Sequence, residues 1–262
     1  MPPTASAITP AHHDHEPASA VVRHARGSPQ YGARLDAAVR RLRQAAQQHA
    51  GRIVQASSLG VEDMVLTDLL RRHDLPVPVA MIDTGMLHPE TLDLLQRLQA
   101  HYGIAVEVWR ASERDLQGFV AEHGGDAMYR SVPLRQACCA LRKVEPLQRL
   151  LAGRSAWLTG LRREQSAGRG TLQAQEQGVD GRWKYSPLFD WSLGDVWQYV
   201  ADFEVPYNEL HDRFFPSIGC APCTRAVTPG EDLRAGRWWW EGGGAKECGL
   251  HVHVRAAQEE RA

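Results

Sequence analysis

The five cysteines of this 262-residue chain are the residues whose types and spacing point most directly to chemistry. Cys138 and Cys139 are adjacent, Cys220 and Cys223 form a Cys-x-x-Cys pair, and Cys248 stands alone near the end of the sequence. Adjacent cysteines make a strained disulfide, whereas both side chains can reach one large inorganic centre. The two pairs therefore predict one four-cysteine metal site, and the fifth cysteine predicts a working thiol.

Either zinc or an iron–sulfur cluster could occupy a site of four thiolates. Residues 138 and 139 lie about 100° apart on a helix, and the turn at 219–223 brings two more sulfurs together. Zinc sites usually carry two knuckles of closely spaced cysteines, and this chain has only one, the Cys-x-x-Cys pair. The adjacent pair suits a [4Fe–4S] cluster better. Zinc, or two unrelated pairs of thiols, are the alternatives.

Cys248 lies in a setting that favours a reactive thiol. Three glycines at 242–244 precede it and Gly249 follows it, so the backbone can act as a hinge. Lys246, one of only three lysines in the chain, is two residues away, and a nearby cation favours the nucleophilic thiolate. We expect Cys248 to act as a nucleophile.

Two loops could hold a nucleotide. The segment SSLGVED at 57–63 joins a strand to a helix, where backbone N–H groups and the helix dipole favour an anion and Gly60 allows close approach. The segment IDTGMLHPET at 82–91 follows the next strand. Because ligands of open α/β sheets bind at the carboxyl edge, the two loops describe a crevice. Taken singly, they could also be a helix cap and a turn before Pro89.

Arginines supply candidate oxyanion ligands. Arg234 and Arg237 are three residues apart, and Arg162, Arg163 and Arg169 lie in a glycine-rich stretch. Arginine forks pair bidentately with phosphate or sulfate. Lys143 stands four residues after Cys139, close to the predicted metal site. A solvated basic surface is the alternative explanation for the arginines.

The elements that must position these residues follow from hydrophobic periodicity. Strands are predicted at 52–56, 77–82, 104–109 and 156–159, and helices at 31–50, 61–73, 89–102, 112–123, 135–151 and 192–202. Residues 160–184 form a long polar stretch that could be a lid. Alternating strands and helices predict an α/β fold, with an open, mostly parallel twisted sheet and helices on both faces.

Length and composition predict how the chain is divided into a domain and its terminal segments. We expect a flexible N-terminal tail at 1–28, one nucleotide-binding domain at 29–240, and a mobile C-terminal segment at 241–262 that carries the working thiol. The net charge of −1 argues against a nucleic-acid partner, and no apolar run approaches the roughly 20 residues of a membrane span. Cytoplasmic location with reduced thiols is expected. A homo-oligomer is compatible with the sequence.

Together these motifs resemble the assimilatory sulfonucleotide reductases, and within them the iron–sulfur type that reduces adenosine 5′-phosphosulfate (APS). The resemblance spans residues 30–252. It is carried by SSLGVED, IDTGMLHPET, CCALRKVEPL, TGLRREQSAGR, KYSPLFDW, GCAPCTRAVTPGEDLRAGRWWWE and KECGLH. Reductases of the 3′-phosphorylated nucleotide (PAPS) typically retain the KECGLH thiol but lack both cysteine pairs.

The resemblance implies an adenine-nucleotide α-hydrolase-like fold, related to ATP pyrophosphatases, and it implies a role for each motif. The phosphate loop would comprise Ser57, Ser58, Gly60, Glu62 and Asp63, and the adenosine pocket Asp83, Thr84, Gly85 and Gly160. The phosphosulfate would be held by Lys143, by arginines among Arg162, Arg163 and Arg169, by Arg234 and Arg237, and by His251 of KECGLH. The cluster ligands would be Cys138, Cys139, Cys220 and Cys223, with Cys248 the nucleophile.

The implied reaction converts APS to sulfite and AMP through an S-sulfonate on Cys248, which thioredoxin or a similar dithiol protein resolves. The phosphate loop departs from the Ser-Gly-Gly-x-Asp-Ser of ATP pyrophosphatases, which argues against cleavage of ATP. Three alternatives are a PAPS reductase, an iron–sulfur tRNA thiolase of the same fold, and a zinc-stapled binding module without catalysis.

Overall fold

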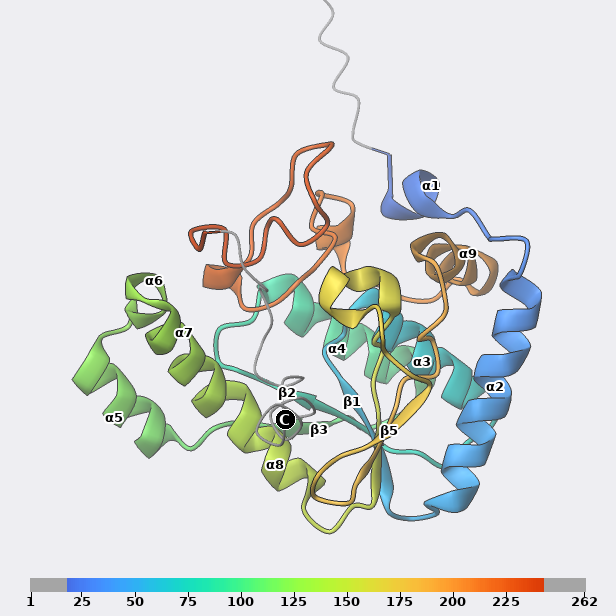
Figure 1. Cartoon of the computed structure of the whole chain (residues 1–262), viewed down its shortest axis with the longest axis horizontal. Helices are drawn as coiled ribbons and strands as arrows, with labels where there is room; N and C mark the ends of the chain where they lie inside the picture. The colour runs from blue at the N-terminus through green and yellow to red at the C-terminus, as the bar shows by residue number, and fades with distance from the viewer. Residues whose placement is uncertain (1–17, 243–262) are drawn as a thin grey trace, which may run out of the picture.

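One sheet of six strands runs through the centre of the molecule, for which the computed structural model describes residues 18–242 (Figure 1). The strands lie in the order β3-β2-β1-β4-β6-β5, and every neighbouring pair is parallel except β5 with β6. The mostly parallel open sheet expected from the sequence is confirmed. The bounds are β1 Ile53–Ser57, β2 Val79–Ile82, β3 Glu107–Trp109, β4 Ala156–Leu158, β5 Gln175–Gln177 and β6 Trp183–Tyr185.

Nine α-helices are assigned within residues 18–242. They are α1 Ala20–His24, α2 Tyr31–Gln48, α3 Val61–Arg72, α4 Pro89–Tyr102, α5 Glu113–His123, α6 Ala127–Arg130, α7 Val132–Cys139, α8 Glu145–Leu151 and α9 Leu193–Phe203. Their starts follow familiar rules: Ser112 and Ser192 cap α5 and α9 through their hydroxyls, and Pro89 occupies the first turn of α4.

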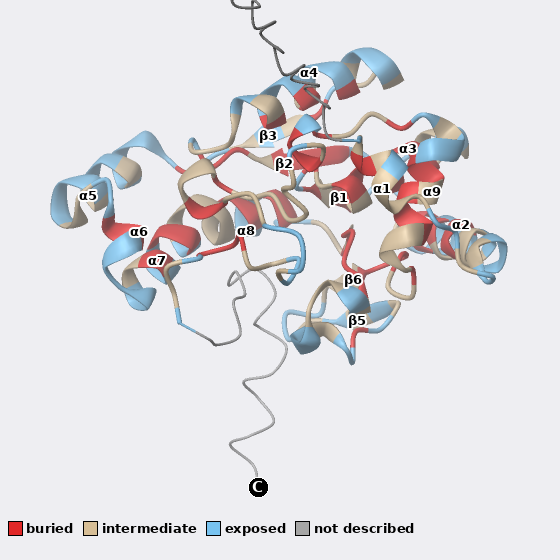
Figure 2. Ribbon diagram, turned by 90° about the horizontal axis from the view of Figure 1, so that it is seen from above, coloured by how far each residue is buried: buried red, intermediate tan, exposed pale blue. Residues whose placement is uncertain are grey.

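Helices cover both faces of the sheet because successive strand side chains point to opposite sides. On one face Val54 and Ala80 join an apolar cluster with Leu147, Leu150 and Leu151 of α8. On the other face Ile53 and its neighbours belong to a larger cluster with residues of α2, α3, α4 and α9. Figure 2 shows these buried positions along the strands and the inward sides of the helices. The strands are therefore clamped, and their carboxyl ends are fixed.

The polar stretch at 160–184, predicted as a long segment that could be a lid, has secondary structure of its own. It contains the short strands β5 and β6, and β6 pairs in parallel with β4. Trp183 and Lys184 are partly exposed there, so the segment lacks the continuous apolar pattern by which buried strands are recognised. The sheet consequently has six strands where the sequence predicts four or five.

The helix predicted at 135–151 begins earlier and is not uniform. The chain is helical from Val132 to Leu151, but a π turn, η1 (Ala140–Val144), separates α7 from α8. A π turn inserts an extra residue into the helical repeat and is frequent at functional sites. Here it carries Lys143, directly after the adjacent cysteines.

The N-terminal tail predicted for residues 1–28 is corrected for its last part. Residues 20–24 form α1, whose Ala20 is buried, and Ser28 donates its backbone N–H to Asp195 at 2.7 Å. Apolar contact with α9 and these polar bonds offset the entropy of ordering the segment. Residues 1–17 lie outside the described range.

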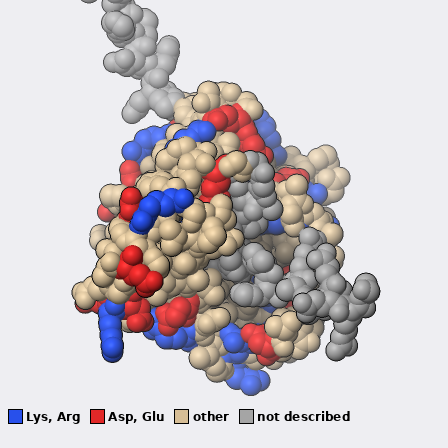
Figure 3. Space-filling model, turned by 60° about the vertical axis from the view of Figure 1, so that its left-hand side comes forward, with Lys and Arg blue, Asp and Glu red and all other residues tan. Residues whose placement is uncertain are grey.

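Within the described residues, no helix is long and apolar enough to cross a membrane. Basic and acidic side chains are interspersed over the face seen in Figure 3, with no broad region of one sign in that view. That distribution agrees with the balanced net charge of the chain.

Candidate functional site

A cavity of about 250 Å³ opens at the carboxyl edge of the sheet, where the loops after β1, β2 and β4 converge. Most of the residues singled out from the sequence line it. Those within 18–242 that line it are Ser57, Ser58, Gly60, Glu62, Asp63, Thr84, Lys143, Gly160, Arg162, Arg169, Arg234 and Arg237. Cys248 and His251 lie outside the described residues.

Asp63 organises the loop after β1. Its Oδ2 accepts hydrogen bonds from the backbone N–H and the hydroxyl of Ser58, both at 2.7 Å, and its Oδ1 accepts the N–H of Gly160 at 2.9 Å. Burial raises the pKa of Asp63 to about 6, although the bonds from Ser58 and Gly160 oppose the shift. Both oxygens face protein donors, so Asp63 joins two loops of the cavity wall.

Two backbone features allow that close packing. A Cβ on Gly160 would lie 2.7 Å from Oδ1 of Asp63, so only glycine fits there. The left-handed residue of the loop is Leu59, with φ of 57°, while Gly60 has an ordinary φ of −66° and caps α3. The loop therefore bends at Leu59, and its N–H groups precede a helix N-terminus, where anions are favoured.

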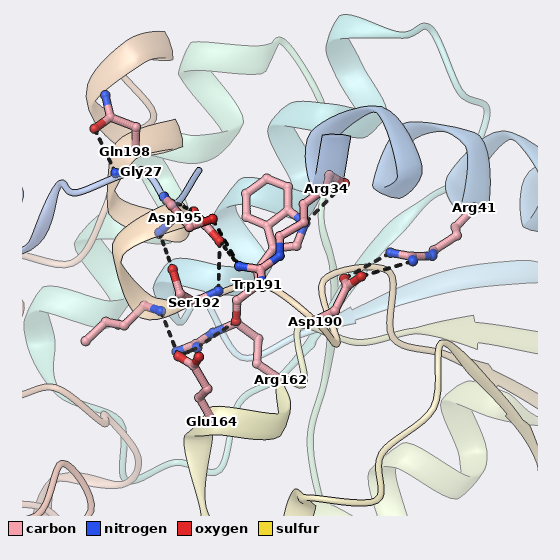
Figure 4. Close-up of polar contacts among 12 residues, drawn as sticks. Gly27, Arg34, Arg41, Arg162, Glu164, Asp190, Trp191, Ser192, Asp195 and Gln198 are labelled. Carbon is pink, nitrogen blue, oxygen red and sulfur yellow. Dashed lines mark hydrogen bonds and ion pairs between the residues drawn. The ribbon is translucent and has the colours of Figure 1, made fainter. Parts of the chain in front are cut away.

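Glu62 and Arg162 form a buried ion pair beside this loop. Arg162 donates to Oε1 of Glu62 from two nitrogens, at 2.8 and 3.0 Å, and to the carbonyl of Trp191 at 3.3 Å. Burial alone would raise the pKa of Glu62, but Arg162 and Gln165 outweigh it and lower the pKa. Figure 4 shows the guanidinium of Arg162 beside Trp191 and Glu164. Most of its hydrogen-bonding capacity is used by the protein.

The other two arginines of the glycine-rich stretch diverge. Arg169 lines the cavity and donates to the side chain of Gln165. Arg163 is not among the described residues that line it, because its guanidinium stacks 4.5 Å from the ring of Phe189 and donates to the carbonyl of Leu172. Arg169 therefore borders the cavity, whereas Arg163 packs within the scaffold.

Asp83 and Gly85 also stand apart from the cavity lining. Asp83 accepts the N–H of Gly85 at 2.9 Å and the Nε of Arg110 at 2.8 Å, and Gly85 has a φ of 68°. These contacts form a turn that presents Thr84, whose side chain meets the cavity. Thr84 also lies 3.2 Å from the sulfur of Cys220. The loop after β2 therefore connects the cavity with the cysteines.

The four cysteines of the two pairs gather in one buried cluster with Met128 and Trp238. Cys138 and Cys139 end α7, Cys220 directly precedes the turn η5 (Ala221–Cys223) and Cys223 ends it, and none of the four is in a disulfide. Burial raises the pKa of Cys138, and it raises the pKa of Cys223 to about 11 with the help of the neighbouring Cys220. Arg142 and Lys143 oppose the shift at Cys138, so cations face these sulfurs.

The donor set fits an inorganic centre that attracts thiolates. Four thiols surround one small enclosed space whose wall also holds Arg135, Arg142 and Lys143. Over residues 18–242, however, no group of three or more His, Cys, Asp or Glu side chains is placed to hold one metal ion.

Lys143 and Trp238 each line both the large cavity and the space among the cysteines. The two sites are therefore neighbours, so a charge in one changes the electrostatic potential in the other. Arg237 lies at the same border, with its guanidinium 4.8 Å from the ring of Trp238 and hydrogen-bonded to the carbonyl of Ile218 at 3.2 Å.

Sequence reasoning missed three residues of this region. His211 lies in the cavity wall with a buried Nε2 atom that has no hydrogen-bond partner among the described residues, and burial lowers its pKa to about 4. Arg135 and Glu241 form a buried ion pair beside the cysteines. The only sequence signal for the pair is two charges next to the cysteine and tryptophan motifs.

Comparison with known proteins gives a consistent result. The chain matches the phosphoadenosine phosphosulfate reductase domain over residues 52–226. The adenosine 5′-phosphosulfate reductase of Allochromatium vinosum is 52% identical over 211 residues, which cover 80% of this chain and 82% of that protein. The corresponding reductase of Burkholderia cepacia is 47% identical over 226 residues, which cover 86% and 90%.

Solved structures support the fold. Phosphoadenylyl-sulfate (PAPS) reductase from Candida auris, in a phosphate complex, superposes with a TM-score of 0.60 at 30% identity and covers 73% of this chain and 90% of its own. FMN adenylyltransferase from Candida glabrata gives a TM-score of 0.55 at 13% identity, covering 95% and 84%, and is informative about fold alone. The expected adenine-nucleotide α-hydrolase-like fold is confirmed.

Proposed function

Because this chain belongs to the adenosine 5′-phosphosulfate reductase family, we propose that it reduces APS to sulfite and AMP in sulfate assimilation and cysteine biosynthesis. The observation that carries the proposal is the shared wall between a nucleotide-sized cavity and four buried cysteines, with Lys143 lining both. A phosphosulfate in that cavity would meet the cations Lys143, Arg169, Arg234 and Arg237.

The chemistry begins at Cys248. Its thiolate attacks the sulfur of APS, an S–S bond forms, and the S–O bond to phosphate breaks as AMP leaves with the electron pair. Cationic side chains and backbone N–H groups stabilise the charge on the departing oxygens. The product is an S-sulfonate on Cys248.

A dithiol protein such as thioredoxin completes the cycle. One of its thiolates attacks Sγ of Cys248, and sulfite leaves with the electron pair of the broken S–S bond. The second thiol of the partner then releases Cys248, so the dithiol supplies the two electrons and ends as a disulfide. The proposal places the enzyme in the cytoplasm, where thiols stay reduced, without a nucleic-acid or membrane partner.

Cys138, Cys139, Cys220 and Cys223 would hold a [4Fe–4S] cluster as the cofactor. When bound, the cluster would supply a fixed charge beside the sulfate-binding end of the cavity. Lys143 follows Cys139 by four residues across the π turn and lies between the two sites. Its ammonium would orient the sulfate group and couple the cysteines to the substrate.

The loops at the carboxyl edge of the sheet would bind the phosphate and the adenosine of the substrate. The 57–63 loop would bind the phosphate through its N–H groups, with Asp63 holding the loop in shape. Thr84 and Gly160 would contact the adenosine from the loops after β2 and β4. Asp83, Gly85 and Arg163 would act through the backbone and packing that they stabilise.

The decisive experiment uses anaerobically purified wild type and Cys248→Ser with APS and reduced thioredoxin. We expect sulfite release from the wild type and a loss of at least about a thousandfold in Cys248→Ser, because a serine hydroxyl is a far weaker nucleophile than a thiolate. Undiminished turnover in Cys248→Ser would falsify the mechanism. Turnover of PAPS in preference to APS would show that the substrate is the 3′-phosphorylated nucleotide.

Two further measurements test for a tRNA thiolase and for a zinc-stapled binding module. Release of AMP and pyrophosphate from ATP, without sulfite from APS, would favour the thiolase. Colourless protein with bound zinc, in place of the visible absorbance of an iron–sulfur chromophore, would favour the zinc-stapled module. Sedimentation of the same sample would show whether the chain forms a homo-oligomer.

A further inference from the structure

A buried ion pair ties the last described residues to the helix that carries Cys138 and Cys139. Arg135 of α7 donates from Nε and Nη2 to the two carboxylate oxygens of Glu241, at 2.7 and 3.0 Å. The two side chains are only 3% and 10% exposed. We propose that this pair, here named the latch, fixes the point from which the Cys248-bearing segment starts, and that Arg135 and Glu241 are positioning residues for S-sulfonate formation.

The latch is built into the cysteine site. Arg135 also hydrogen-bonds to Cys139, and its guanidinium stacks 4.5 Å from the ring of Trp238. Trp238 in turn donates its backbone N–H to the carbonyl of Cys223 at 3.2 Å. One arginine on the helix of the first cysteine pair therefore contacts both Cys139 and the segment leading to Cys248.

The chain before Glu241 is held in the same way. Thr224 pairs with Arg237 in a β-bridge, and the N–H of Glu241 donates to the carbonyl of Trp238 at 2.9 Å. Trp238 has a φ of 43°, a left-handed conformation that is costly for a tryptophan and persists only where the surroundings enforce it. Figure 1 shows this C-terminal segment beside α6 and α7. These contacts already hold the segment before Glu241 against the cysteine site, and the latch adds one more contact at its end.

Chain length makes the anchor point matter. Cys248 follows Glu241 by seven residues, so a fully extended chain would reach at most about 25 Å from the latch. A tether of that length holds a thiol at high effective concentration only when its start lies close to the target. The latch starts the tether at the cysteines, whose space adjoins the wall of the nucleotide cavity. Releasing Glu241 would add residues between the nearest fixed point and Cys248, and so would widen the range of distances that chain length allows.

The bidentate geometry of the pair suits it to hold Glu241 in one position. An arginine fork fixes both the distance and the orientation of a carboxylate, which a lysine cannot do. Glu241→Gln keeps the shape of the side chain but removes its charge. Arg135→Lys removes the fork but keeps a cation beside Glu241, so no buried charge loses its partner. It is the second test of the latch if Glu241→Gln fails to fold.

The proposal rests on the proposed function, and its test isolates one step of it. Each variant is mixed with APS in the absence of thioredoxin, and the S-sulfonate on Cys248 is followed by mass spectrometry in a single turnover. We expect both variants to form it at least about tenfold more slowly than the wild type, because misplacement of a reacting group costs rate. The affinity for APS and the visible absorbance should stay within about twofold of the wild type.

Asp190→Asn serves as the matched control. It removes another bidentate pair, between Arg41 and Asp190 at 3.1 and 3.2 Å, that lies away from the cysteines. The S-sulfonation rate should be unchanged in it. Equal rates in wild type, Glu241→Gln and Arg135→Lys would overturn the latch. Loss of absorbance or APS affinity in both latch variants would assign the pair to holding the cysteine site and also overturn it. If the wild type itself forms no S-sulfonate, the proposed function falls together with the latch.

Discussion

Three arginines within eight residues illustrate that the role of a side chain is decided by what it touches. Arg162 is neutralised by Glu62 and buried, Arg163 stacks on Phe189, and Arg169 lines the cavity. All three have the same charge in the sequence. Only a guanidinium that faces the cavity can donate its N–H groups to a phosphosulfate bound there.

This difference leads to a prediction for a matched pair of variants. Arg169→Gln should weaken APS binding by roughly 10- to 100-fold, the usual range for a hydrogen bond to a charged group. Arg163→Gln should change it by less than about threefold, because its lost contacts are with Phe189 and Leu172. Equilibrium binding of APS to each variant measures both effects. Equal losses in the two variants would show that Arg163 also reaches the ligand.

Much of the site could be predicted from the sequence because its chemistry resides in rare residues. The adjacent cysteines and the Cys-x-x-Cys pair are recognisable without coordinates, and they do meet in one buried cluster. Asp83 was expected beside adenosine, but whether it faces a ligand depends on Arg110, 27 residues away. Partners so distant in sequence leave no local pattern, and the pair of Arg135 and Glu241 was missed for the same reason.

At the scale of elements, the periodic helices and the apolar strands were predictable, whereas the short polar strands β5 and β6 and the π turn were not. The bounds predicted for the helix at 89–102 agree with α4, and those at 31–50 agree with α2 within two residues. Hydrophobic periodicity needs several turns or strand residues to stand out. The strands β5 and β6 have three residues each, and the π turn η1 changes hydrogen bonding without changing composition. Such features are set by packing.

Asp195 shows how one carboxylate can join several elements. It accepts the backbone N–H groups of Ser28 at 2.7 Å and Ser192 at 3.0 Å, and it pairs with Arg34 of α2 at 2.5 Å (Figure 4). Burial alone would raise its pKa, but these bonds outweigh it and lower the pKa from 3.8 to about 2. A carboxyl whose pKa is depressed by folding stabilises the fold above its unfolded pKa, and that contribution is lost as the pH falls through the folded pKa.

Asp195→Asn should therefore lower the free energy of unfolding by about 2 kcal/mol at pH 7, and the deficit should shrink between about pH 4 and pH 2. Urea unfolding of wild type and variant at a series of pH values measures it. Asp190→Asn, whose ion pair with Arg41 is about a quarter exposed, should lose less than about 1 kcal/mol. A deficit that is constant down to the lowest pH would show that the asparagine harms packing and that charge is not the cause.

The N-terminal segment that contains α1 contacts residues that lie far from it in the sequence. Figure 1 shows α1 beside α9, and the backbone N–H of Ala20 donates to Asp212 at 2.6 Å. Arg23 donates to the carbonyl of His211 at 2.6 Å and stacks 4.5 Å from the ring of Phe214, which has a left-handed φ of 63°. His211 lies in the cavity wall. A segment near the start of the chain therefore supports a wall formed some 190 residues later.

A variant that begins at residue 29 should consequently melt roughly 5–10 °C below one that begins at residue 18, since a loss of 1 kcal/mol shifts Tm by about 2–4 °C in a domain of this size. It should also bind APS more weakly, because His211 and the strained Phe214 lose the contacts of Arg23 that hold them. Calorimetry and APS binding on the two variants test both effects. Arg23→Gln in the full chain isolates the second: it removes the stacking and the charged donor while leaving Ala20 buried, and it should reproduce part of the loss in affinity with a smaller loss in Tm. Identical melting of the two truncated variants would mean that α1 rests on the domain without stabilising it, and the wall around His211 would then have to be held by the 208–218 loop alone.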